Sequence, residues 1–302
     1  MGDRVVSLPP VGARVSLRYR LPAGSTPPHT DVVGHIVETG ERVVVRTRRS
    51  EDVAVAAADV LAVRVVPEMP VRTSQIRNLE HAAALAWPGA EREVVDGWLL
   101  RAGHGSTRRA NSAVPIEVSA APPLAAIVDW YGRRGLPPLI AAPDRLLRLP
   151  DGVPTDGENV VLTADLSPDP PRADGVTVAA RPDEAWRALY ERDVPIDVLS
   201  AVVDGDVAFA TLADVAVARG AVTAAPDGAR WLGLSAVHVT PGARRGGAGR
   251  MVCDALLAWG ADRGAAYVYV QVLPDNAPAL ALYEAMGLRP HHRSRYVDAR
   301  NL

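Results

Sequence analysis

A glycine-rich turn between an apolar strand and a helix is the feature that most limits what this 302-residue chain can fold into. An apolar stretch ends at Val239, and the turn that follows contains the letters RRGGAGR at residues 244–250, directly before a helical pattern. Glycines allow a tight turn, and the first amides of a helix have no partner within it. These amides and the positive end of the helix dipole favour a phosphate group. The sequence therefore predicts a strand–turn–helix unit that binds a phosphate or pyrophosphate.

A second motif follows one helix and one strand later, at residues 276–288, with the letters NAPALALYEAMGL. Together the two motifs resemble the GNAT superfamily of acyl-CoA-dependent N-acetyltransferases over residues 176–302. Leu288 stands where the family usually has phenylalanine. The residues that match the two family signatures are Arg244, Gly247, Gly249, Asn276, Ala279, Leu282, Tyr283 and Gly287.

The resemblance implies an enzyme that uses acetyl-CoA as co-substrate, needs no metal, and moves the acetyl group to a primary amine by direct attack. Tyr283 stands at the place of the family's general acid, where a phenol with a pKa of about 10 can protonate a departing thiolate. Its alternative role is packing against the apolar face of its helix. Asn276 would bond the pantetheine amide, cap its helix, or do both.

The resemblance also implies a donor-binding set on the strand end, the turn and the following helix. The strand end would pair with the pantetheine arm through its main chain, and the turn would hold the pyrophosphate through amides and arginine charges. The members of this set are Val237, His238, Val239, Arg244, Arg245, Gly246, Gly247, Ala248, Gly249, Arg250 and Asn276.

The general base stays open. Some family members carry a glutamate at the place of Gly233, which cannot act as a base. His238 can accept a proton near neutral pH, but strand alternation points its side chain away from its neighbours unless a bulge changes the phase. The remaining alternatives are a water held by Ser235 and the carboxylates of Glu117 and Asp204.

Composition describes an ordinary globular protein with a net charge of -2 and 48% hydrophobic residues. No apolar run approaches a membrane span and no signal peptide is apparent, so we expect a cytoplasmic protein without a membrane partner. Cys253, the one cysteine, lies in an apolar helix pattern, which favours a buried side chain over a nucleophile. All 33 basic residues are arginine, a bias typical of a GC-rich genome such as that of an actinobacterium.

The pattern along the chain predicts three parts: an SH3-like β-barrel at residues 1–68, a GNAT-like half without a glycine loop at 69–175, and the catalytic GNAT domain at 176–302. The fold class is α/β (α+β) with a mixed sheet. Strands are expected in the first part at 13–19, 31–39, 42–48, 53–56 and 60–66, followed by a proline-bounded linker at 67–70. Acidic residues offset the arginines of the barrel, so we expect no nucleic-acid partner.

In the middle part we expect a helix at 75–87 capped by Ser74, strands at 94–102, 109–117, 139–142, 146–149 and 160–165, and a helix near 122–134. Trp98, Arg101 and Asn111 are candidates for contacts with the acceptor, and the alternative is that this part only packs on the sheet of the catalytic half. His291 and His292 follow the last motif on a closing strand, where adjacent side chains point to opposite faces and do not chelate one metal.

Three functions remain open from sequence. The leading interpretation is acetylation of a small-molecule primary amine. The second is acetylation of a protein lysine or N-terminus, with the N-terminal part as a docking module. The third is a non-catalytic acyl-CoA sensor, which would not need the acid Tyr283. A homodimer is a possible assembly, and the sequence does not fix the oligomeric state.

Overall fold

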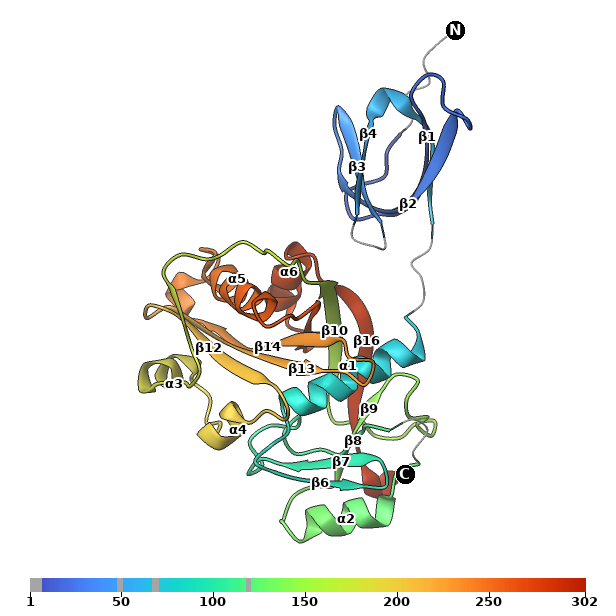
Figure 1. Cartoon of the computed structure of the whole chain (residues 1–302). Coiled ribbons are helices and arrows are strands. Elements are labelled where there is room, and N and C mark those ends of the chain that lie inside the picture. The colour runs from blue at the N-terminus through green and yellow to red at the C-terminus, as the bar shows by residue number, and fades with distance from the viewer. Residues whose placement is uncertain (1–6, 48–50, 67–70, 118–120) are drawn as a thin grey trace. The chain divides into compact units, whose positions relative to one another are not determined.

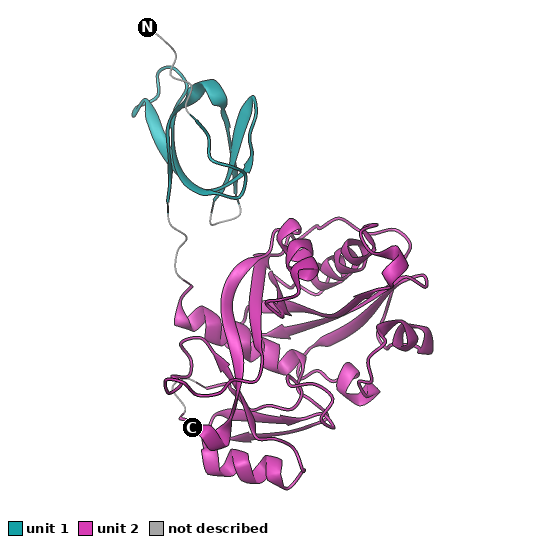
Figure 2. Cartoon of the chain, turned by 180° about the vertical axis from the view of Figure 1, so that it is seen from behind, with its two compact units in different colours: residues 1–70 teal, residues 71–302 magenta. Residues whose placement is uncertain are grey.

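The chain forms two compact units in a computed structural model, residues 1–70 and residues 71–302 (Figure 2). The structure describes residues 7–47, 51–66, 71–117 and 121–302. The linker expected at 67–70 lies outside these residues. Each unit has its own hydrophobic core. No described helix has the length and apolar character that a membrane crossing requires.

The first unit is an antiparallel five-stranded sheet in the order β4-β3-β2-β1-β5. Its strands follow the predicted hydrophobic alternation, with buried Val15, Leu17, Ile36, Val43 and Val45 at its centre. Among the described residues, β4 pairs only with β3 and β5 only with β1, so the curved sheet is not closed into a barrel by hydrogen bonds. The strands are β1 Arg14–Arg20, β2 His29–Glu38, β3 Arg42–Thr47, β4 Asp52–Ala56 and β5 Val60–Val65.

The second unit is built on a mixed eight-stranded sheet, which confirms the expected α/β fold class (Figure 1). Its order is β11-β12-β13-β14-β15-β10-β16-β9, and β14 and β15 form its parallel pair. The strands are β9 Leu139–Pro143, β10 Glu158–Asp165, β11 Val176–Ala179, β12 Asp206–Leu212, β13 Ala216–Ala224, β14 Arg230–Val239, β15 Tyr267–Val272 and β16 Arg289–Asp298.

Helices cover both faces of this sheet. On one face, α5 (Ala248–Ala261) and α6 (Ala277–Ala285) pack on Leu232, Leu234 and Val270. On the other face, α1 (Thr73–Ala86) packs on Trp231 and Tyr269, and the short helices α3 (Glu184–Tyr190) and α4 (Ile196–Ser200) pack beside it. The alternation of side chains along β14 and β15 separates the two cores.

A smaller layer lies beyond the α1 face. It consists of a three-stranded sheet, β6 (Glu91–Val95), β7 (Trp98–Ala102) and β8 (Val114–Pro115), and of helix α2 (Leu124–Gly132). The segment around it also supplies β9 and β10 to the large sheet, and β10 is inserted between β15 and β16. The boundary expected at residues 175 and 176 therefore falls inside one compact unit, and the division into two halves stays a description of sequence pattern.

Several expected elements differ in the structure. The strand predicted at 94–102 is a hairpin, because Asp96 and Gly97 both adopt positive φ and form a two-residue turn. The strand predicted at 109–117 shortens to β8, and no strand forms at 146–149. Helix α1 begins at Thr73 rather than after Ser74, with the Gln75 side chain accepting the Arg72 N–H at 2.8 Å.

Candidate active site

The turn after β14 leaves a row of free amides at the start of α5. Gly247 is the N-cap residue with φ 87°, and Arg245 also has positive φ, so the chain turns sharply into the helix. In this described segment, the backbone N–H groups of Arg245, Gly247, Ala248, Gly249 and Arg250 donate to no backbone carbonyl. A β-carbon at Gly247 would meet nothing within 4 Å, so there is open space beside this residue. The turn thus has the form of an anion cradle.

The arginines of the turn differ in the hydrogen bonds and ion pairs that their side chains make. The exposed Arg244 donates from Nε to the Val239 carbonyl at 3.2 Å, which holds the side chain against the end of β14. Arg250 pairs with Asp254 one helical turn later at 2.7 Å, so its charge is shared. Arg245 has no ion pair within the described residues. Gly246 and Gly249 complete the turn, and a β-carbon at Gly249 would approach Val239 and Leu282 to 3.3 and 3.4 Å.

The strand beside the turn opens toward its neighbour. Pairing between β14 and β15 ends at Leu234 and Val270, although both strands continue. Beyond that point β14 is paired with β13 alone, so one side of its main chain is available for an added extended segment. This side carries the residues expected to bind the pantetheine arm.

A β-bulge lies at this opening. Ser235 pairs with Arg219 and His238 pairs with Val217, so two residues of β14 oppose one of β13, and Ala236 has φ 51°. Val237 and Val239 pack on the α5 core, whereas His238 turns to the other face, as the alternation predicted. Its Nε2 is buried, lacks a hydrogen bond within the described structure, and lies 3.6 Å from the Glu191 carboxylate.

Tyr283 lies on the buried face of α6. Its side chain lies in the core that contains Cys253 and residues of the first turns of α5. Burial raises the pKa of Tyr283 above its ordinary value, with smaller effects from Cys253 and Arg109, so the phenol keeps its proton at any working pH. Asn276 caps α6, accepting the Ala279 N–H at 3.3 Å, and its amide donors stay available. Cys253 itself is buried, and burial raises the pKa of its thiol to about 12.

A narrow cavity lies on the α1 face, close to the opening between the strands. Its lining combines charged and polar groups from α1, from β7 and the loop after it, and from β10, β15 and β16. Gln271 directly follows Val270, the last residue of β15 that pairs with β14, so the cavity lining reaches the opening between these two strands. The polar groups of the lining are Glu80, Arg101, Arg109, Asn159, Gln271, Ser294 and Tyr296.

Glu80, which lines this cavity, forms a buried pair with His292. The two side chains are 5% and 1% exposed, and His292 Nε2 lies 2.8 Å from Glu80 Oε1. His292 Nδ1 lies 2.8 Å from His291 Nδ1, so the three residues form a continuous chain of hydrogen bonds. The expectation that the two histidines face opposite sides is wrong, because a bulge between Pro290 and His292 brings their rings together.

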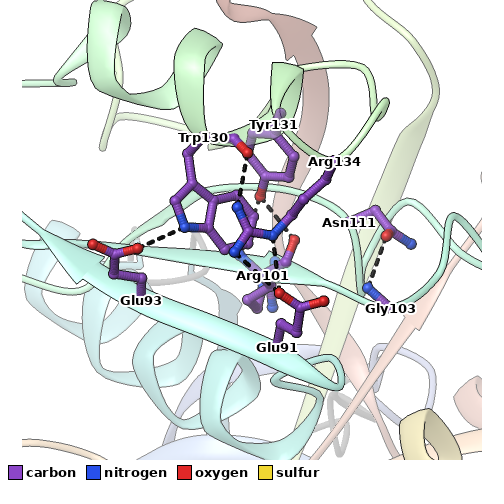
Figure 3. Close-up of polar contacts among 8 residues, drawn as sticks. All are labelled: Glu91, Glu93, Arg101, Gly103, Asn111, Trp130, Tyr131 and Arg134. Atoms are coloured by element: carbon purple, nitrogen blue, oxygen red, sulfur yellow. Dashed lines mark hydrogen bonds and ion pairs between the residues drawn. The ribbon is translucent and has the colours of Figure 1, made fainter.

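The other acceptor candidates have structural contacts. Asn111 Oδ1 accepts the Gly103 N–H at 2.8 Å and holds the loop after β7, and Trp98 is buried against α2. The Arg101 backbone N–H and C=O both bond the Tyr131 hydroxyl, at 3.1 and 2.9 Å (Figure 3). Arg101 alone among these three lines the cavity.

The candidate bases proposed from sequence are not gathered at this cavity. Glu117 and Asp204 are exposed, and Ser235 Oγ lies 3.4 Å from the Arg219 guanidinium. The place of Gly233 is closed, because a β-carbon there would lie 2.4 Å from the Tyr269 hydroxyl oxygen. Sequence reasoning missed Glu80, although an acidic residue four positions from the buried Ile76, on the apolar face of α1, was a visible signal.

The free amides before α5, the opening between β14 and β15, and Tyr283 beside it define a GNAT-type N-acetyltransferase, an enzyme class that uses acetyl-CoA as co-substrate. The chain belongs to the family described as "Probable histone acetyltransferase Rv0428c C-terminal", whose model matches residues 73–297. Residues 9–64 match "Rv0428c N-terminal Sm-like domain", which agrees with the small β unit expected at the N-terminus.

Individual proteins support the same assignment. The chain is 47% identical over 300 residues to "Probable histone acetyltransferase Rv0428c" of Mycobacterium tuberculosis, covering 99% of this chain and 98% of that one. It is 24% identical over 250 residues to "Uncharacterized N-acetyltransferase YobR" of Bacillus subtilis, covering 72% and 97%. The solved "GCN5-related N-acetyltransferase from Kribbella flavida" shares the fold, with a TM-score of 0.51, 16% identity, and coverage of 76% and 96%.

Proposed function

We propose that this enzyme transfers the acetyl group of acetyl-CoA to a primary amine by direct attack, and that the amine belongs to a small molecule. The observation that supports it most is the row of free amides before α5 beside the unpaired main chain of β14. The amides of residues 245–250 bind the pyrophosphate, with Arg244, Arg245 and Arg250 adding charge. Val237–Val239 pair with the pantetheine arm, Asn276 bonds its amide, and a β14 main-chain N–H bonds the thioester oxygen.

The transfer needs two proton movements. The amine nitrogen forms a bond to the thioester carbon while the carbon–sulfur bond breaks, and Tyr283 gives its phenol proton to the departing sulfur. The proton that the amine loses goes to Glu80. Glu80 passes this proton to Nε2 of His292, and Nδ1 of His292 gives its proton to Nδ1 of His291, which is partly exposed. The carboxylate and the two imidazoles thus form a path from the cavity toward the surface.

The narrow, charged cavity favours a small polar acceptor over a protein chain. A protein amine is the second candidate, because the relative that is 47% identical carries the name "Probable histone acetyltransferase". The two candidates differ in size and in charge, since histone tails are basic and the cavity carries arginines. One assay that compares small amines with histone peptides can therefore distinguish the two candidate acceptors.

The experiment measures thiol release from acetyl-CoA with a panel of small primary amines and, in parallel, lysine-containing histone peptides. We expect at least one small amine to be acetylated with a higher kcat/KM than any peptide, and Glu80→Gln to lower kcat by about 100-fold with acetyl-CoA affinity retained. A higher kcat/KM for the histone peptides than for every small amine would indicate that the enzyme acetylates proteins instead. Binding of acetyl-CoA with no amine accelerating thiol release favours the sensor.

A further inference from the structure

Three arginines surround Trp87 at the end of α1, and two of them are held entirely by uncharged groups. Arg101 is 3% exposed and donates to the Ser112 carbonyl, the Ser112 hydroxyl and the Trp87 carbonyl at 2.9–3.3 Å. Arg219 is 1% exposed and donates to the carbonyls of Leu199, Ala86 and Ala201 at 2.6–2.9 Å. Neither has a carboxylate partner among the described residues. Their guanidinium N–H groups are thus hydrogen-bonded to neutral oxygen atoms, and no carboxylate of the described residues neutralises their charges.

Arg109 differs from these two because the fold does not use its donors. It lies in the loop between β7 and β8 and lines the cavity. Its Nε is buried and has no hydrogen-bond partner in the described structure. Its guanidinium lies 5.6 Å from the Trp87 ring centre, and that of Arg219 lies 4.4 Å from the same ring. A guanidinium offers five donors in a planar fork that suits a carboxylate, so Arg109 is available to a ligand.

The cavity therefore has an excess of positive charge. Its one carboxylate, Glu80, is already bonded to His292. The pKa of Arg219 is lowered to about 9, chiefly by burial, and the charge of Arg109 acts in the same direction. Burial likewise lowers the pKa of Arg101, with Arg109 contributing in the same direction. Cations that repel one another in a low-dielectric interior are stabilised by an anion placed between them.

The charge of Arg109 also affects two buried tyrosines, one of which is the proposed general acid Tyr283. Its positive charge lowers the pKa of Tyr283 and of Tyr269, in both cases against the larger rise that burial causes. Asn159 and Gln271, which are uncharged, line the same cavity as Arg109, and Gln271 lies on β15 one residue past the point where its pairing with β14 ends.

We propose that Arg109 binds a carboxylate of the acceptor, and that the acceptor is a small amino-acid-like molecule carrying both a primary amine and a carboxylate. This inference rests on the proposed acetyl transfer to a small amine. A carboxylate suits the narrow cavity better than the bulkier phosphate group. Arg109 holds the carboxylate, and the amine then points toward the thioester with Glu80 near its proton.

The turnover test uses pairs of amines that differ only in charge at the far end: glycine and glycinamide, β-alanine and β-alaninamide, γ-aminobutyrate and its amide. Thiol release is compared at equal concentration of free amine. We expect the acid of the best pair to exceed its amide in kcat/KM by about 10- to 100-fold, the value of a hydrogen bond to a charged group. Arg109→Gln removes that preference. Arg92→Gln, at an exposed position on β6, is the matched control and retains it.

A binding test separates this inference from the proposed function. Melting temperatures of the full chain are measured with propionate, propionamide and inorganic phosphate at constant ionic strength. Propionate should raise the melting temperature of the wild type and of Arg92→Gln but not of Arg109→Gln, and propionamide should not raise it. Absence of an Arg109-dependent propionate effect, or a larger effect of phosphate, overturns the carboxylate site. Carboxylate binding without acetylation of any amine instead contradicts the proposed function alone.

Discussion

At the scale of single residues, Tyr283 carries the most specific chemical proposal. Its phenol is buried, and its pKa is raised by that burial, so the proton is always present when the thiolate leaves. We predict that Tyr283→Phe lowers kcat by about 100-fold or more, the range typical of general acid catalysis, while acetyl-CoA affinity changes little. Steady-state kinetics and calorimetry on the same preparation measure both. Wild-type turnover in the variant would reassign Tyr283 to packing.

His291 predicts a pH dependence of stability. Burial and the neighbouring His292 lower its pKa from 6.5 to about 4, with Glu80 opposing and Arg145 adding to the effect. Above pH 6.5 the His291 ring is neutral in both the folded and the unfolded state, so its protonation does not lower the free energy of unfolding. As the pH falls from 6.5 toward 4, the unfolded chain binds the proton first, so stability decreases across that window. Urea unfolding at pH 7.5 and 5.0 should show a larger loss for the wild type than for His291→Asn. Equal losses would contradict the shifted pKa.

The site residues that could be proposed from sequence are those of the two motifs, because their backbone pattern is local. In the structure Gly247 is the N-cap of α5, Asn276 is the N-cap of α6, and Tyr283 lies in the core beneath α6. Glu80 and Arg109 were not predicted, since they meet only when α1 and the loop after β7 pack on the far face of the sheet. A single charged residue in a helix pattern does not reveal the partner that the fold brings to it.

At the scale of elements, the contact between β14 and β15 explains why this chain has glycine where some relatives in the superfamily have a catalytic glutamate. The Tyr269 ring covers Gly233, so a β-carbon would lie 2.4–2.8 Å from its hydroxyl and ring atoms. We predict that Gly233→Ala costs about 1–3 kcal/mol of stability, as overpacking does. Tyr269→Leu removes the ring, and the penalty of Gly233→Ala should shrink in that background. Strict additivity in urea unfolding of the four variants would argue against the clash.

Element boundaries were predictable wherever hydrophobic alternation decides them. Strands β1, β2 and β3 of the first unit follow that rule, with buried residues at alternate positions. The Asp96-Gly97 pair is a hairpin signal that the strand predicted at 94–102 overlooked. The bulges at Ala236 and His291 could not be predicted from sequence, because they arise from pairing with β13 and β10. The insertion of β10 into the large sheet is likewise a property of the tertiary fold.

At the scale of the whole molecule, the division into residues 1–70 and 71–302 predicts that donor binding does not need the first unit. All residues of the proposed donor site lie in the second unit, which has its own core. A chain beginning at Val71 should bind CoA with an affinity within about threefold of the full chain, a difference of less than 1 kcal/mol. A folded second unit that fails to bind CoA would show that the N-terminal unit contributes to the site.

The titration of acetyl-CoA into the full chain is the most direct test of the proposed acetyl transfer, because the reaction requires the donor to bind at the cradle before α5. We predict about one site per chain, since the sequence of residues 69–175 contains no glycine-rich motif like that at 244–250. Gly247→Glu should abolish binding through charge repulsion. Its control is Gly228→Glu, in the turn between β13 and β14, which has similar φ and equal open space but lies outside the cradle. Normal affinity in folded Gly247→Glu, or two equivalent sites per chain, would contradict the assignment.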